Sequence, residues 1–259
     1  MKSPHRKHRY LSSRECALSL VELLIVIAIA GVLATLAVPA LSGLNGANKL
    51  TSAAYTIQGA LDQARTYAVA NNTYTWVGIY EEDGSQPSQT PARSGIGRVV
   101  ISVVASQDGT SVYKKKAAEA QTAQTLTPGR LIQLGKTIRL ENVHILDASG
   151  EKVGQRPAGL IKAKDIVGLA SSPQLFSFQY PLTGAAAYTF GRGPGPGASG
   201  VVQFNPQGEA VCNSGSITNP SSNLEIAIQE ARGSQVGNSA NIIALNIGGL
   251  TGQTTMYRP

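Results

Sequence analysis

A single carboxylate stands at the edge of a long apolar run near the start of this 259-residue chain. Residues 23–44 contain no charged side chain, and Glu22 immediately precedes them. As an α-helix rising about 1.5 Å per residue, this run spans the ~30 Å hydrocarbon core of a bilayer. A carboxylate placed there costs about 2.5–3.5 kcal/mol on insertion scales, so an acidic residue in a membrane usually has a partner and a function. Glu22 is therefore a candidate for charge pairing, in which an opposite charge relieves the cost of burial.

A basic tail and a short motif precede the apolar run. The tail, residues 2–14, carries Lys2, Arg6, Lys7, Arg9 and Arg14. The motif reads Ala17-Leu18-Ser19-Leu20-Val21-Glu22. Together they resemble the processing site of type IV prepilins and of the pseudopilins of type II secretion. In that family a basic leader is cut after a small residue, usually Gly, and the new N-terminal residue, usually Phe, is methylated.

The resemblance implies a role for each position of the motif. Cutting is expected between Ala17 and Leu18, which stand where the family usually has Gly and Phe, and Leu18 is then the site of N-methylation. Ser19 and Leu20 match the residues that follow the cut. Glu22 is the residue whose carboxylate, in the family, neutralises the freed amine of a neighbouring subunit during filament assembly.

A long helix is expected to carry this motif. Residues 18–72 are predicted to form it, and about 22–44 of these span the membrane. Pro39, where the family commonly has proline, removes a backbone hydrogen bond, so a bend near residues 35–36 is expected. Beyond the span, apolar residues recur at spacings of three and four over residues 50–68. This stripe predicts a helix face that lies against a sheet.

Residues 73–259 are predicted to form one β-rich globular domain. Segments rich in β-branched and aromatic residues favour strands at 73–80, 99–104, 136–146, 174–180, 200–204, 224–229, 241–247 and 254–257. Their connections favour an antiparallel meander, with a turn at 81–84, long surface loops at 81–98 and 105–130, and a short helix at 117–124. The predicted fold class is thus α+β, a long N-terminal transmembrane helix packed on an antiparallel β-sheet domain, as in pilins. Residues 53–80 and 202–208 also resemble the GspH/FimT-type minor pseudopilins.

The charge distribution predicts a membrane topology. The formal charge of the chain is +7, and five basic residues against Glu15 place more than half of it in the leader, residues 1–17. Positive charge stays in the cytoplasm, so the helix is expected to cross the inner membrane once, with the β-rich domain in the periplasm. The lysines at 114–116 and Arg192 could touch nucleic acid. A run of three charges is usually a solvated face, however, so nucleic-acid binding is not predicted.

The residues that could support catalysis or metal binding are few and scattered. His5, His8 and Cys16 lie in the leader, which leaves His144 in a strand-like segment and Cys212 without an intrachain cysteine partner. A structural role is expected for His144, and no disulfide, metal site, cofactor or catalytic constellation is predicted. The glycine- and proline-rich residues 191–200 lack the ending of a P-loop and are expected to form a surface loop.

These patterns favour a structural subunit over an enzyme. They predict a minor pseudopilin, processed by prepilin peptidase and assembled through its N-terminal helix into a type IV pilus or a type II secretion pseudopilus. The resemblance implies several partners: the peptidase, other pilin-like subunits, inner-membrane lipid, and an assembly ATPase with its platform protein. Two alternatives stay open, a signal-anchored periplasmic binding or scaffold protein that does not assemble, and an envelope enzyme built on the β-rich domain.

Overall fold

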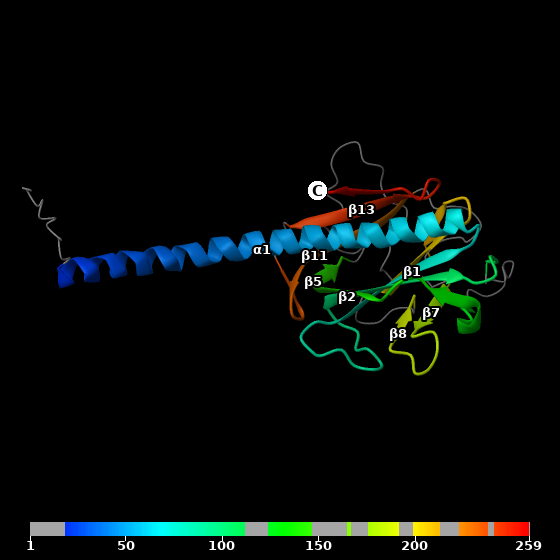
Figure 1. Cartoon of the computed structure of the whole chain (residues 1–259), viewed down its shortest axis with the longest axis horizontal. Coiled ribbons are helices and arrows are strands. Elements are labelled where there is room, and N and C mark those ends of the chain that lie inside the picture. Colours follow the sequence, from blue (N-terminus) through cyan, green and yellow to red (C-terminus); the bar gives the residue numbers. More distant parts are fainter. Residues whose placement is uncertain are drawn as a thin grey trace, which may run out of the picture. The chain divides into compact units, whose positions relative to one another are not determined.

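A computed structural model describes residues 19–111, 124–146, 165–166, 176–191, 199–212, 223–237 and 241–258. The chain divides into two compact units, Met1–Asn45 and Gly46–Pro259. One helix, α1 (Leu20–Ala70), begins in the first unit and ends in the second. The predicted α+β class, an N-terminal helix combined with an antiparallel sheet, is confirmed (Figure 1).

In the first unit, α1 exposes its apolar side chains. Every large apolar residue from Leu20 to Leu33 is at least 51% exposed, although such residues are usually buried in globular proteins. A helix that is apolar on all sides usually belongs to an apolar surrounding. Over the described residues, no helix combines the length and the apolar content that crossing a membrane requires.

In the second unit, α1 covers one face of a large sheet. The predicted stripe is confirmed, because its members are at most 1% exposed: Leu50, Ala54, Ile57, Leu61, Ala64 and Ala68. Ala53 and Ala60 are buried beside them. They share one buried cluster with strand residues such as Val77 and Val202. Burial of each Leu or Ile side chain stabilises the folded state by about 1.5–3 kcal/mol. The helix ends at Ala70, and Asn72, with a φ of 49° that Asn tolerates, turns the chain toward the first strand.

The large sheet is built from strands that are far apart in the chain. Its spatial order is β10 (Ala210–Cys212), β9 (Ser199–Phe204), β1 (Thr75–Asp83), β2 (Gly97–Ser106), β5 (Ile138–Ile145), β11 (Asn223–Arg232), β13 (Ile242–Gly248) and β14 (Thr254–Tyr257). In addition, β4 (Leu131–Gln133) pairs with β2, while β6 (Asp165–Ile166) and β12 (Gln235–Val236) pair with β11. The pairings along the main path are antiparallel, but β9 returns from late in the chain to pair with β1. The predicted meander is therefore wrong, because apolar alternation identifies strands but not their neighbours.

A smaller sheet covers the other face of β1 and β2 (Figure 1). It contains β3 (Gln124–Thr125), β7 (Phe176–Tyr180) and β8 (Tyr188–Phe190) in this order, and the short 3-10 helix η1 (Pro128–Arg130) follows β3. Side chains alternate along a strand, so Val77 of β1 faces α1 whereas Trp76 faces the small sheet. Both faces of β1 are therefore buried, and the second unit has three layers.

Gly78 lets the two sheets approach each other. A Cβ atom at this position would lie 2.5 Å from Cζ of Phe178 and 2.5 Å from Cγ of Phe190. The two phenyl rings, whose centroids are 4.9 Å apart, fill the space that a side chain at Gly78 would need. A residue without a side chain is thus required in the middle of β1, where glycine otherwise weakens a strand.

The structure corrects the predicted boundaries around β1 and β2. The residues predicted as a turn, 81–84, continue β1 through Asp83, and the predicted loop 81–98 shrinks to residues 84–96. Glu81 and Glu82 are 1% and 2% exposed, because distant residues provide partners for their carboxylates. The predicted loop 105–130 contains the end of β2, β3 and η1. Of the helix predicted at 117–124, residues 117–123 lie outside the described residues, and Gln124 belongs to β3.

Candidate functional site

The start of α1 is built by two residues of the motif, Ser19 and Glu22. The backbone N–H of Ser19 donates to Oε2 of Glu22 at 3.0 Å, and the backbone N–H of Glu22 donates to Oγ of Ser19 at 3.3 Å. This reciprocal arrangement is a capping box, which satisfies two backbone donors that a helix start leaves without partners. The Ser-x-x-Glu spacing is the sequence signal from which this helix start could have been predicted.

The remaining motif residues are placed only in part. Leu20 is the first helical residue and is 79% exposed. Pro39 lies within α1. Ala17 and Leu18 fall outside the described residues, so cleavage between them and methylation of Leu18 stay predictions. The bend expected near residues 35–36 likewise stays a prediction.

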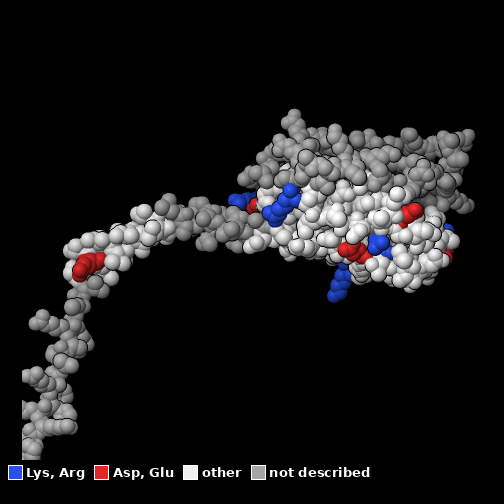
Figure 2. All heavy atoms as spheres, turned by 90° about the horizontal axis from the view of Figure 1, so that it is seen from above, with Lys and Arg blue, Asp and Glu red and all other residues white. Residues whose placement is uncertain are grey.

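Glu22 is the one ionisable side chain among residues 19–35, the part of the first unit whose side chains the structure describes. In Figure 2 this stretch of the helix accordingly shows acidic colour near its start and no basic colour. Within these residues, the carboxylate has no cation beside it and is held by the amide of Ser19 alone. A negative charge in the first turn is also favoured by the positive end of the helix dipole. The geometry thus presents an acceptor that is available to a cation.

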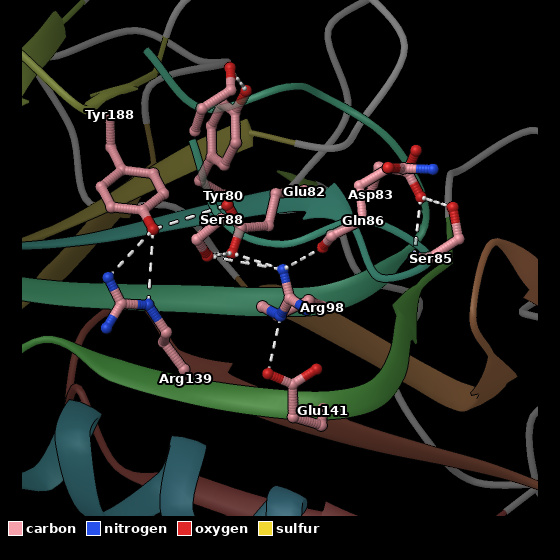
Figure 3. Close-up of polar contacts among 11 residues, drawn as sticks. Tyr80, Glu82, Asp83, Ser85, Gln86, Ser88, Arg98, Arg139, Glu141 and Tyr188 are labelled. Atoms are coloured by element: carbon pink, nitrogen blue, oxygen red, sulfur yellow. Dashed lines mark hydrogen bonds and ion pairs between the residues drawn. The ribbon is translucent and has the colours of Figure 1, made fainter. Parts of the chain in front are cut away.

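A second group of polar residues lies in the second unit, around Arg98 of β2 (Figure 3). Its Nη1 donates to Oε1 of Glu82 at 3.1 Å, and its Nε donates to Oε1 of Glu141 at 2.6 Å. The hydroxyl of Ser88 donates to Oε1 of Glu82 at 2.6 Å, and that of Tyr188 to Oε2 at 3.5 Å. Burial lowers the pKa of Arg98, but its hydrogen bonds with Glu141 and Glu82 outweigh this effect and raise the pKa above its ordinary value. Each oxygen of the buried Glu82 is therefore satisfied.

Tyrosine and arginine side chains extend this group toward the small sheet. Nη2 and Nε of Arg139 lie 3.2 and 3.4 Å from the hydroxyl of Tyr188, and this contact raises the pKa of Arg139. Tyr80 shares a 2.6 Å hydrogen bond with Ser94, and burial raises the pKa of the Tyr80 hydroxyl. The group joins β1, β2, β5, β8 and the loop at 84–96. Its bonds run between strands of the two sheets, so we interpret it as a structural network that holds the small sheet against the large one.

His144 occupies a separate, partly buried position on β5. Its Nδ1 lies 2.9 and 3.1 Å from the two carboxylate oxygens of Glu81, which also accepts the backbone N–H of Gly97 at 3.0 Å. This placement ties β5 to β1 across β2, as a structural role requires. Cys212 is buried on β10. Across the described ranges, the acidic, histidine and cysteine side chains form no group of three or more that could hold a metal ion.

Replacing Glu82 is expected to destabilise the second unit far more than replacing Glu141, although both carboxylates bind Arg98. The side chains of Glu82 and Arg98 are 2% and 11% exposed, and removing one member of a buried pair costs about 3–5 kcal/mol. Glu141 is 55% exposed, so Glu141→Gln should cost about 1 kcal/mol or less. Urea unfolding followed by the fluorescence of Trp76, the single tryptophan, compares Glu82→Gln with this control. Equal losses in the two variants would contradict the role of Glu82.

The comparisons with known proteins agree with the geometry at the start of α1. The prokaryotic N-terminal methylation motif matches residues 12–38, which include Ser19, Leu20 and Glu22. The match supports prepilin-type processing of the chain. Over these residues the chain is similar to the type IV pilin-like proteins, and the match supports that family. No curated protein and no solved structure matches the chain.

Proposed function

We propose that this chain is a minor pseudopilin, a structural subunit of a type IV pilus or of a type II secretion pseudopilus. In this proposal prepilin peptidase cuts between Ala17 and Leu18, and the N-terminal helix then carries the subunit into a filament of pilin-like subunits. The observation that carries the proposal is the methylation motif at residues 12–38, with Glu22 held at the very start of an apolar helix. An assembly ATPase and a platform protein would supply the energy for extraction from the membrane.

The proposed topology follows from the distribution of charge. The basic leader, residues 1–17, stays in the cytoplasm. A single helix of about residues 22–44 spans the inner membrane. Residues 73–259 then lie in the periplasm, or outside the cell once the filament has formed. The exposed apolar side chains of the first unit support this proposal, because lipid or other helices can cover them.

Charge pairing gives the proposed assembly its selectivity. An apolar helix that moves from lipid into a bundle of similar helices changes its burial little, so small contributions decide whether it assembles. A pair formed by Glu22 and the amine of Leu18 on a neighbouring subunit is one such contribution. An unpaired charge in an apolar surrounding is costly, and the attraction between the two opposite charges of the pair offsets that cost for both.

The large second unit supports a minor rather than a major role. A small sheet of β3, β7 and β8 adds a layer to the large sheet and buries the outer face of β1. Such an addition suits a specialised subunit, in keeping with the resemblance of residues 53–80 and 202–208 to the GspH/FimT-type pseudopilins. The filament could serve secretion, motility, adhesion or DNA uptake.

The N-terminus of the processed protein is the first test of this proposal. Intact-mass and N-terminal sequencing of the chain, purified from membranes of cells that contain a prepilin peptidase, should give a start at Leu18, with or without a methyl group. The same chain from cells without the peptidase should keep residues 1–17. An uncut chain in both strains, or a cut beyond residue 38, would support a signal-anchored scaffold protein instead.

A further inference from the structure

Three hydrogen bonds fasten α1 to β14 and the residues beside it. The pairs are Thr51 with Arg258, Gln58 with Thr254, and Arg65 with Thr251. Nε2 of Gln58 donates to the carbonyl oxygen of its partner at 3.3 Å, and Nε of Arg65 does so at 2.7 Å. We call these three contacts the polar seam. Because residue numbers rise along α1 while they fall along β14, the two segments run antiparallel (Figure 1).

The spacing of the polar seam fits a helix and a strand that lie along each other. Its α1 members are seven residues apart, which is nearly two helical turns, so they share one face of the helix. From Thr51 to Arg65 the helix rises about 21 Å. Residues 251–258 extend about 23 Å as a strand. The two lengths agree closely enough for all three contacts to form at once.

Arg65 is held by more than its hydrogen bond. Its side chain lies on two glycines, Gly208 between β9 and β10 and Gly252 between β13 and β14. A Cβ atom at Gly252 would lie 2.9 Å from Cδ of Arg65, and one at Gly208 would lie 3.5 Å from Nε. Here the two ends of the strand order meet, because the N–H of Ala210 in β10 donates to the carbonyl of Gly249 at 2.6 Å. Arg65 thus fastens α1 where the sheet closes on itself.

The polar seam resists sliding of the helix in a way that the apolar stripe does not. Apolar attraction is roughly proportional to buried area and has no preferred direction. Toward the end of α1 this attraction comes from the small side chains of Ala60, Ala64 and Ala68. A hydrogen bond, in contrast, weakens steeply once its donor and acceptor lose their alignment. Displacement along the helix axis therefore breaks the polar seam, whereas it exchanges one apolar surface for another.

We propose that the polar seam carries tension from α1 into the β-rich domain. The inference rests on the proposed function, in which a subunit is drawn out of the membrane by its helix. Without the seam, tension would reach the sheet chiefly at β1, through residues 71–74 and a 3.0 Å hydrogen bond from Thr75 to the carbonyl of Ala64. With the seam, β14 at the end of the strand order shares the tension with β1. The domain then follows the helix without unfolding.

Single-molecule pulling of the full chain in a detergent micelle tests the inference. Azide-bearing residues in place of Lys49 and Leu250 anchor two DNA handles, because both side chains are exposed and neither belongs to the seam. Tension between the handles drives α1 and the turn before β14 in opposite directions. Arg65→Met keeps a long side chain but loses a charged donor, so the lifetime of the fold at constant tension should fall about tenfold. Gln58→Met loses a neutral hydrogen bond and should shorten this lifetime about fivefold.

Two controls separate tension along the helix from general stability. Gln63 is exposed and makes no hydrogen bond among the residues that the structure describes, so Gln63→Met should keep the wild-type lifetime. Handles at Gln107 and Gln235, which are exposed and lie outside α1 and β14, apply tension that does not enter through the helix. With these handles Arg65→Met should stay within about twofold of the wild type, as substitutions away from the strained contacts do.

Wild-type lifetimes in both Arg65→Met and Gln58→Met under tension along the helix overturn the inference. Equal shortening with the two pairs of handles also overturns it, because the seam would then contribute only to overall stability. If Arg65→Met does not fold, Gln58→Met decides the question alone. The pulling measurement does not depend on removal of the leader, so N-terminal sequencing tests the proposed function separately.

Discussion

Glu22→Ala is expected to lose its leader as efficiently as the wild type and yet to be nearly absent from filaments. Without the carboxylate, the amine of Leu18 enters the apolar bundle unpaired. A charge in that surrounding costs about 2.5–3.5 kcal/mol, which corresponds to roughly a hundredfold loss of incorporation. The measurement compares the fraction of mature chain in sheared filaments between the variant and the wild type, with both expressed beside the other subunits.

Glu22→Gln separates the charge of this residue from its structural role. Glutamine at this position completes a capping box as well as glutamate does, so the start of α1 should be preserved. The variant nevertheless lacks the negative charge, and it should be excluded from filaments like Glu22→Ala. Incorporation of either variant at the wild-type level would refute charge pairing as the basis of assembly.

Gly78→Val is expected to displace the small sheet from the large one. The first added carbon would already lie 2.5 Å from both Phe178 and Phe190, and β1 cannot retreat because it pairs with β2 on one side and β9 on the other. Overpacking of a core typically costs about 1–3 kcal/mol, and we expect at least the upper part of this range. Urea unfolding monitored by Trp76, which lies beneath the small sheet, measures the loss.

Gly59→Ala is the matched control for this variant. Gly59 lies in α1, and apart from the adjoining turns of the helix itself no atom lies within 4 Å of the added carbon. Alanine favours a helix over glycine by about 1 kcal/mol. The control should therefore be as stable as the wild type or more so. If Gly78→Val unfolds at the same urea concentration as Gly59→Ala, the claim that the two sheets leave no room for a side chain at residue 78 is refuted.

The helical half of the fold could be predicted from the sequence because its signals are local. Spacings of three and four placed Leu50 and Leu61 on one face, and both are buried as expected. The strand predicted at 99–104 also has a local signal, a run of β-branched residues, and it forms the centre of β2. Ser19 and Glu22 also carry a local signal, because the spacing of a capping box is enough to place the start of α1 at Leu20.

The topology could not be predicted because it depends on residues that are distant in the chain. Residues 81–84 have the composition of a turn, and the burial of Glu81 and Glu82 depends on partners such as His144 and Arg98, which other strands supply. The strand β8 has three residues and no clear period, so it becomes recognisable only once Phe190 packs against Phe178. Pairing of β9 with β1 follows from the three-dimensional core and not from the order of the strands.

The boundary between the two units falls inside α1, between Asn45 and Gly46, and not at the first strand. A shortened chain that begins at Thr73 would lack the helical cover of the large sheet, leaving residues such as Val77 and Ile226 open to water and to aggregation. One that begins at Gly46 would keep Ile57 and its neighbours on that face. Soluble fragments for crystallisation or antibody production should accordingly retain the second half of the helix.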